Sequence, residues 1–156
     1  MSEIVKGLLL NTGKQFLAEL LAGKYANDKF GMYIEYYNGT PSAPSIIATR
    51  NKDYYTNLAS PSGYVRVPFV STAALIGSDY KAVFSGTVLP GYTTSGGSLS
   101  SSSKFYSATL VYMPDSTSSS TDIPIFVRNF YLGDTFSPVS YVANTNFTAT
   151  INLALG

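Results

Sequence analysis

The chain has 156 residues, of which 45% are hydrophobic and only 12% are charged. Its formal net charge of +1 excludes the strongly basic surface of a typical nucleic-acid-binding domain. It has no Cys and no His, which excludes disulfides, Cys-based zinc sites and His-based catalytic triads. A chain of this length buries about 70% of its unfolded surface. We therefore expect one domain over 1–156 that needs no metal or cofactor.

The N-terminal segment predicts neither a secretory signal nor a membrane anchor. Its apolar run at 8–10 is shorter than the apolar region of a signal peptide. No window of about 18 apolar residues occurs, so we expect no membrane span and no membrane partner. The protein is then expected to be made in the cytosol, or to assemble from there.

A short amphipathic helix is predicted at 13–22, within an N-terminal strand-and-helix segment at 1–24. Thr12 is a suitable N-cap, and Gln15 completes the capping-box spacing. Gly23 suits the left-handed position that ends a helix. The apolar face is formed by four residues at helical spacing: Phe16, Leu17, Leu20 and Leu21. Because so short a helix is unstable alone, this face should pack on the rest of the protein or on a neighbour.

The remainder, 25–156, is predicted to form β-strands. Pro68 interrupts one of them and indicates an edge position or a strand end. Apolar alternation or β-branched and aromatic residues mark the strands, at 30–37, 64–70, 81–89, 104–113, 123–132 and 147–155. This pattern predicts a mainly β protein, an antiparallel jelly-roll-like β-sandwich with one short N-terminal helix. A sandwich of the immunoglobulin kind stays open.

Two Ser-rich loops, at 91–104 and 114–122, are predicted to be mobile. Asp115 and Asp122 flank the second Ser/Thr run, and carboxylates with hydroxyls are ligands that calcium accepts. The spacing matches no known calcium loop, so ordinary loop acids are the favoured interpretation.

Five tyrosines cluster in sequence around two predicted loops: Tyr36, Tyr37, Tyr54, Tyr55 and Tyr64. If exposed, their rings could stack on sugars, since aromatic faces combine apolar area with a polar hydroxyl. Tyrosine is also common in strands and at protein interfaces. Packing within strands or between subunits is therefore favoured over carbohydrate binding.

No arrangement of residues predicts catalysis. The nine acidic residues are scattered, and neither a G-x-S-x-G turn nor a phosphate-binding loop occurs. A glycoside hydrolase that uses two carboxylates is the least favoured alternative. We expect a protein that is not an enzyme.

The strand at 123–132 is apolar on both faces, which predicts an interface between subunits. Phe126, Phe130 and Leu132 share one face with Arg128, and Ile125 and Val127 lie on the other. A sandwich buries one face of each sheet, so the second face needs a cover. Arg66 and Arg128 lie in apolar strands and face outward or pair across such an interface. The predicted interface residues are Phe16, Leu17, Leu20, Leu21, Arg66, Phe126, Arg128 and Phe130.

Two stretches of the chain resemble virion proteins of tailed bacteriophages. The first is GLLLNTGKQFLAELLAGK at 7–24, an apolar strand followed by N-x-G and a short Leu/Ala helix. The second is DYYTNLASPSGYVRVPF at 53–69, where an aromatic loop leads into a G-Y-V-R-V-P strand. The resemblance implies a structural subunit, usually a β-sandwich that trimerises or docks on a larger shell or tail.

The resulting hypothesis is a non-enzymatic virion protein. It would be a capsid decoration (cement) subunit or a small tail, baseplate or fibre component that binds copies of itself, as a homotrimer, and the major capsid or tail proteins. The alternative is a carbohydrate- or receptor-binding module at a fibre tip that uses the Tyr-rich loops.

Overall fold

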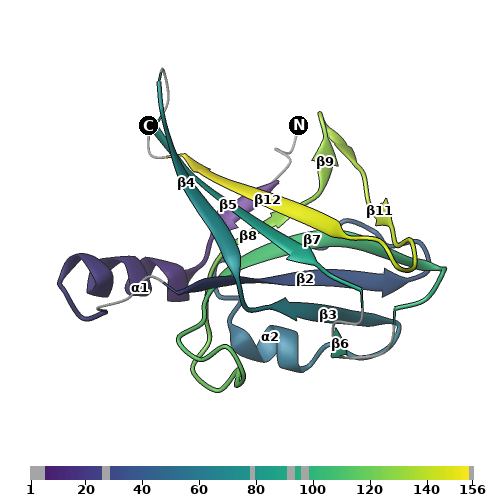
Figure 1. The fold of residues 1–156 in the computed structure, drawn as a ribbon, viewed down its shortest axis with the longest axis horizontal. Helices are drawn as coiled ribbons and strands as arrows, with labels where there is room; N and C mark the ends of the chain where they lie inside the picture. The colour runs from purple at the N-terminus through teal and green to yellow at the C-terminus, as the bar shows by residue number, and fades with distance from the viewer. Residues whose placement is uncertain (1–5, 26–28, 78–79, 91–93, 96–98, 155–156) are drawn as a thin grey trace.

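The computed structural model describes residues 6–25, 29–77, 80–90, 94–95 and 99–154. The described elements are mostly strands, and two antiparallel sheets make up the body (Figure 1). No described helix is long and apolar enough to cross a membrane. The elements follow in the order β1 (Gly7–Leu9), α1 (Asn11–Leu21), β2 (Phe30–Asn38), α2 (Lys52–Thr56), β3 (Ser62–Val67), β4 (Val70–Ile76), β5 (Tyr80–Val88), β6 (Thr94–Ser95), β7 (Ser103–Tyr112), β8 (Ile123–Asn129), β9 (Tyr131–Leu132), β10 (Thr135–Phe136), β11 (Val139–Ser140) and β12 (Phe147–Ala154).

The two sheets differ in width. The large sheet has seven strands in the order β1-β8-β7-β2-β3-β6, with β11 also paired to β7. The small sheet has three strands in the order β12-β5-β4, and β9 and β10 form a separate ribbon. The predicted mainly β, antiparallel fold is confirmed. Jelly-roll connectivity is not, since a jelly roll has eight strands in two sheets.

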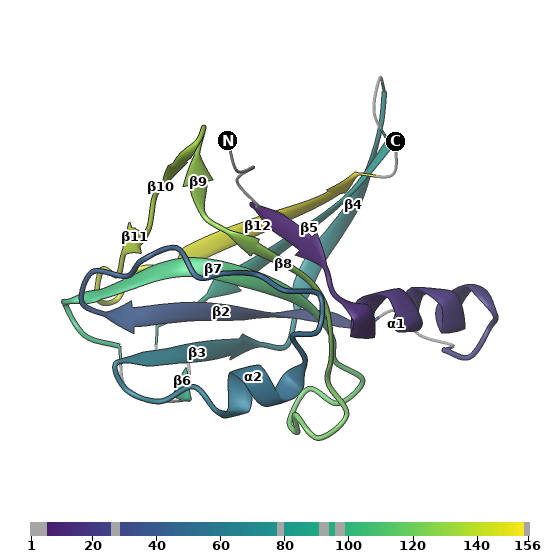
Figure 2. The same cartoon turned by 180° about the vertical axis from the view of Figure 1, so that it is seen from behind.

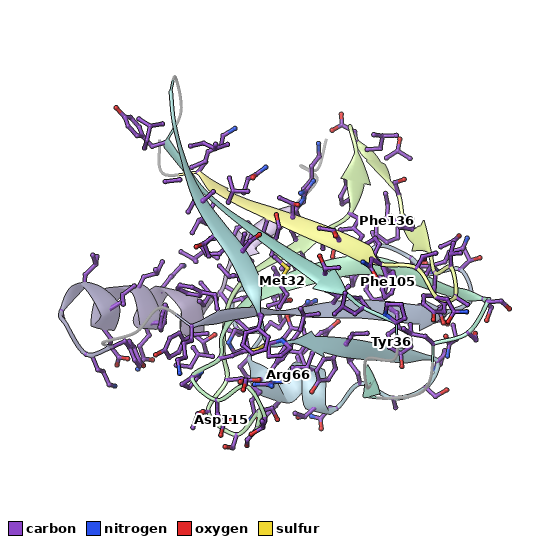
Figure 3. The ribbon with its side chains drawn as sticks, viewed as in Figure 1. Met32, Tyr36, Arg66, Phe105, Asp115 and Phe136 are labelled. Atoms are coloured by element: carbon purple, nitrogen blue, oxygen red, sulfur yellow. The ribbon has the colours of Figure 1, made fainter. Side chains whose placement is uncertain are left out.

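The main core lies between the two sheets (Figure 3). Strand alternation turns Met32, Ile34 and Leu110 of the large sheet toward Phe84 and Ile151 of the small one. The sheets come closest at Gly86, where an added Cβ would lie 2.9 Å from the Met32 sulfur. This glycine lets β5 approach β2, so the small sheet is seated over the middle of the large one.

The other face of the large sheet is covered by α2 and by long loops. Figure 2 shows the loop between β2 and α2 crossing this face. Tyr33, Tyr55 and Val111 form a second buried cluster there. The helix α2 is absent from the sequence-based prediction because it has only five residues, and its Asn51 cap is its main local signal.

The helix α1 confirms the predicted N-terminal helix, although its start differs. Leu10 occupies the N-cap position without a side-chain cap, so the predicted capping box is wrong. The Thr12 hydroxyl instead donates to the Pro124 carbonyl at 2.6 Å. Gly13 touches β8, because an added Cβ would lie 2.2 Å from the Ile125 carbonyl oxygen. Close packing on β8 therefore sets where this helix begins.

The apolar face of α1 is buried unevenly. Phe16 is 1% exposed and packs against Tyr25 and Tyr112, while Leu17 and Leu20 are half-buried against the core. Leu21 is 88% exposed, so it does not pack within the chain, and its contact with a neighbour stays a prediction. The helix ends as expected at Gly23, whose φ is +84°.

The strand predictions hold for β2, β5, β7, β8 and β12, and differ around two interruptions. Pro68 separates β3 from β4, so the predicted strand at 64–70 is two strands. The predicted strand at 123–132 stops at Asn129, and β9 then leaves to pair with β10. In Figure 1, β4 and the start of β5 extend well beyond the large sheet.

Candidate functional site

One side of the sandwich is open, because the three-stranded small sheet is narrower than the large sheet. The inner face of β8 continues past β12, and Phe126, Arg128 and Phe130 are only half-buried there. Between β8 and β12 lies a groove of about 370 Å³, which we call the side groove. It is lined by Arg128, Phe130, Tyr131, Leu132, Ser137, Val139, Phe147, Thr148, Ala149 and Thr150. A second hollow of about 260 Å³ adjoins it at Arg128 and includes Phe126 and Lys6.

Aromatic packing shapes the floor of the side groove. Phe147 of β12 stacks on Phe105 of β7 with ring centroids 4.4 Å apart, and Phe130 lies 6.0 Å from Phe147. Leu132 is 77% exposed at the rim, and Val139 is exposed as well. The groove therefore presents apolar surface that water contacts in the isolated chain.

Arg128 spans the groove rather than projecting from the molecule. Its Nη1 donates to the Thr150 carbonyl of β12 at 3.1 Å. Among the described strands β12 pairs only with β5, so this carbonyl lies on the free edge of the small sheet. The predicted partner of Arg128, a group on another subunit, stays a prediction, and the contact seen is within the chain.

The predicted interface residues fall into three separate places. Phe126, Arg128 and Phe130 meet along the side groove and its neighbouring hollow. Phe16, Leu17, Leu20 and Leu21 lie on α1, where all but Leu21 pack on the core. Arg66 lies on β3, at the other side of the large sheet. Sequence reasoning thus located the β8 cluster and placed Leu132 on the same apolar face, but it missed Val139 at the rim.

Arg66 forms an ion pair within the chain. Its Nε and Nη2 donate to the two carboxylate oxygens of Asp122 at 2.9 and 2.8 Å. Three further donations reach the backbone carbonyls of Asp115, Ser116 and Ser118. These contacts hold the loop 114–122 against β3, which is more support than the sequence led us to expect for this loop. The other Ser-rich loop lies partly outside the described residues.

The two acids proposed as calcium ligands, Asp115 and Asp122, each bind other groups of the chain. Asp122 is buried and also accepts from the Tyr33 hydroxyl at 2.5 Å. Asp115 is exposed and accepts from the Thr117 backbone N–H, which holds the pKa of its carboxyl below the usual value. Among the described residues, no three His, Cys, Asp or Glu side chains gather as metal ligands. The ordinary-loop interpretation fits this geometry.

The tyrosines proposed for sugar stacking are not exposed. Tyr36, Tyr55 and Tyr64 are buried, and Tyr37 and Tyr54 are half-buried. Burial raises the pKa of Tyr54 to about 12, which fits a phenol held away from water. The favoured interpretation, packing, describes these rings, and the carbohydrate hypothesis loses the residues on which it depended.

A buried ion pair, Glu35 with Arg50, was missed from the sequence. Arg50 Nη1 lies 3.2 Å from Glu35 Oε1, and the Tyr106 hydroxyl donates to Oε2 at 2.6 Å. The Arg50 guanidinium also stacks 3.8 Å from the Tyr54 ring centre. Burial raises the pKa of Glu35, while Arg50 and Tyr106 oppose that shift. A lone Glu within an apolar strand was the available signal for such a partner.

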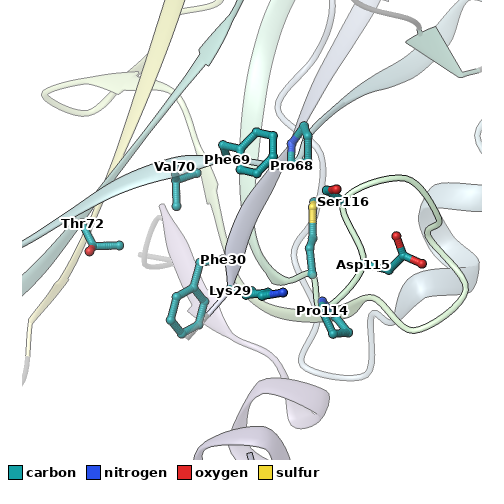
Figure 4. A pocket seen from close by; sticks show the side chains of 10 residues that line it. Lys29, Phe30, Pro68, Phe69, Val70, Thr72, Pro114, Asp115 and Ser116 are labelled. Carbon is teal, nitrogen blue, oxygen red and sulfur yellow. The ribbon is translucent and has the colours of Figure 1, made fainter. Parts of the chain in front are cut away.

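A hollow at the base of β4 has a volume of about 540 Å³ (Figure 4). Phe30, Phe69 and Val70 give it apolar walls, and Lys29 and Asp115 are its charged lining residues. This lining holds no pair of carboxylates placed for acid–base chemistry. Phe69 itself is 70% exposed, which adds to the apolar surface around β4.

No family model matches the chain, and neither a curated protein nor a solved structure does. The resemblance to phage virion proteins therefore rests on the two sequence stretches alone.

Proposed function

We propose that the chain is a non-enzymatic structural subunit of a tailed-phage virion. It binds copies of itself, as a homotrimer, and neighbouring capsid or tail proteins. Its place is that of a capsid decoration (cement) subunit or of a small tail, baseplate or fibre component.

The side groove carries this proposal. It is an opening into the sandwich core, with aromatic walls and one charged residue, Arg128. Interfaces of permanent complexes are depleted in charge and enriched in aromatic residues at their centre. A neighbouring subunit that fills the groove would complete the core that the small sheet leaves uncovered.

Composition and sequence resemblance support the virion setting. The charged fraction of 12% is low for a protein that stays alone in solution, since about 25% is usual. The outer face of β12 is hydroxyl-rich, and Thr148 and Thr150 lie exposed there. A subunit packed at high copy number has this combination of apolar contacts and uncharged polar surface. The stretches at 7–24 and 53–69 point to tailed phages among such assemblies.

The virion role is tested on particles. Particles from the phage or prophage that carries the gene are purified on a density gradient, and the chain is sought by mass spectrometry and by immunogold labelling. We expect the chain in the particle band, with labels at regular positions. A chain found only in the soluble part of the lysate would contradict the proposal.

The groove itself is tested with two exposed residues. Leu132→Lys places a charge on the rim of the side groove, whereas Val142→Lys changes a 60%-exposed residue that does not line it. We expect the first variant to be lost from particles and the second to be retained. Equal incorporation of both would show that the groove is not the contact.

A further inference from the structure

We propose that β4 of one chain lies in the side groove of a neighbouring copy, along the free edge of β12. The small sheet would then continue from chain to chain. This inference rests on the proposed self-association and names the segment that enters the groove.

Most of β4 does not pack on the hydrophobic core. Every residue from Ser71 to Ile76 is exposed, including Leu75 at 55% and Ile76 at 74%. Its one strand partner is β5, so its other edge is free along the described chain. Natural edge strands are commonly protected by charged residues, proline or bulges. The sequence VSTAALI has no charge and no proline, and its pairing with β5 shows no bulge.

In the side groove, part of the hydrophobic core is not covered by any described strand. The free edge of β12 borders it, and the Thr150 carbonyl there is met by Arg128 rather than by a strand. Beneath that edge, Phe126 and Phe130 are half-buried. One more strand beside β12 would cover these rings and extend the small sheet toward the width of the large one.

The side chains of β4 are distributed as this contact requires. Thr72 lies opposite the buried Phe84 of β5, so Thr72, Ala74 and Ile76 share the inner face of the small sheet. In the neighbour, this inner face would lie against Phe126 and Phe130. Ala73 and Leu75 lie on the outer face and would stay in solvent.

The chain direction permits a closed ring. Both β4 and β12 pair antiparallel with β5, so they run parallel to each other at the two edges of one sheet. A rotation about an axis along the strands therefore brings β4 beside the neighbour's β12 in a parallel pair. Such a contact joins two different surfaces, and it forms a ring when the rotation closes. The expected homotrimer is one such ring.

Two neighbouring alanines give a matched test. Ala74→Lys puts a charge on the inner face of β4, and Ala73→Lys puts the same charge on the outer face. Both positions are exposed, so both variants should keep the wild-type circular dichroism. By size-exclusion chromatography with light scattering, we expect Ala74→Lys to run as a monomer and Ala73→Lys to keep the oligomer. Wild-type mass for Ala74→Lys would overturn the proposal.

Cross-linking identifies the partner surface, because the natural chain has no cysteine. Chains carrying Ala74→Cys are co-expressed with chains carrying Leu132→Cys and treated with a short bismaleimide. We expect a covalent dimer from the co-expressed pair and none from either variant alone. A covalent dimer from Ala74→Cys alone would show that β4 pairs with β4 and overturn the groove contact. An oligomer without the mixed product would refute this inference but not self-association, whereas a monomeric wild-type chain would refute both.

Discussion

The buried pair of Glu35 and Arg50 shows how single residues hold the covered face of the large sheet together. Arg50 is 4% exposed and Glu35 is fully buried, so each charge depends on the other, and the Tyr106 hydroxyl also donates to the carboxylate. Desolvation of two ions is costly, and their attraction offsets it only with good geometry. The pair therefore joins the loop before α2 to β2.

Removal of one partner should cost far more than removal of both. Arg50→Met leaves an unpaired buried carboxylate, and we expect the free energy of unfolding to fall by about 3–5 kcal/mol. The double variant Glu35→Gln, Arg50→Met should lose clearly less. Urea unfolding measures both changes. Equal losses in the two variants would show that the ion pair is not coupled.

At this scale the sequence predicted the class of residue but not its partner. Arg66 was expected to face outward or to pair across a subunit interface, and it pairs within the chain with Asp122, which lies 56 residues away along the sequence. Pairings over such distances depend on which strands meet, and no local pattern encodes that. The same limit applies to the hydrogen bond from Tyr33 to Asp122.

The elements show which local patterns suffice to predict structure. The helix α1 and the strands β2 and β12 follow from apolar periodicity. The strands β7 and β8 follow instead from their β-branched and aromatic residues, and β7 is buried on both faces. Periodicity did not reveal β4, because an exposed strand buries neither face and leaves no alternation to detect. Its signals were only Pro68 before it and Gly77 after it. The side groove likewise depends on how two sheets of unequal width overlap, which follows from tertiary packing.

Substitutions of two adjacent leucines in α1 test whether the helix packs on the core as the structure shows. Leu20 packs on the core and Leu21 is 88% exposed. We expect Leu20→Asp to lower the free energy of unfolding by about 2–4 kcal/mol, because it buries an unpaired charge. Leu21→Asp should change it by about 0.5 kcal/mol or less, as exposed substitutions usually do. Thermal unfolding followed by circular dichroism distinguishes them, and similar melting of the two variants would contradict the observed packing of α1.

Buried tyrosine hydroxyls link the stability of the whole molecule to pH. Burial raises the pKa values of Tyr33, Tyr54, Tyr55 and Tyr106, that of Tyr54 to about 12. The folded protein therefore keeps protons that the unfolded chain releases near pH 10. Their contribution to stability is complete below that pH and is lost as the pH rises toward the folded values.

Stability should consequently fall steeply in alkali. Each phenol that stays protonated only in the folded state removes about 1.4 kcal/mol per pH unit above pH 10. Urea unfolding between pH 8 and about pH 11.5 measures this slope, and Tyr54→Phe should make it shallower. A free energy of unfolding that stays constant over this range would contradict the burial of these hydroxyls.

The proposed assembly follows from two regions of the sandwich that lack packing partners within the chain. The small sheet leaves the aromatic floor of the side groove uncovered at β12, and at its other edge β4 extends without a core. In a closed ring of chains, β4 of each chain would cover the side groove of the next. In an isolated chain, both surfaces would remain in contact with water. Self-association is thus the property on which the proposed function and the contact of β4 with the side groove both depend.

The mass of the unmodified protein in solution tests this property most directly. Size-exclusion chromatography with light scattering, over a range of micromolar concentrations, compares the particle mass with the 16.7 kDa of one chain. We predict a mass near three times that value, which persists on dilution. A stable mass of 16.7 kDa at every concentration would contradict it.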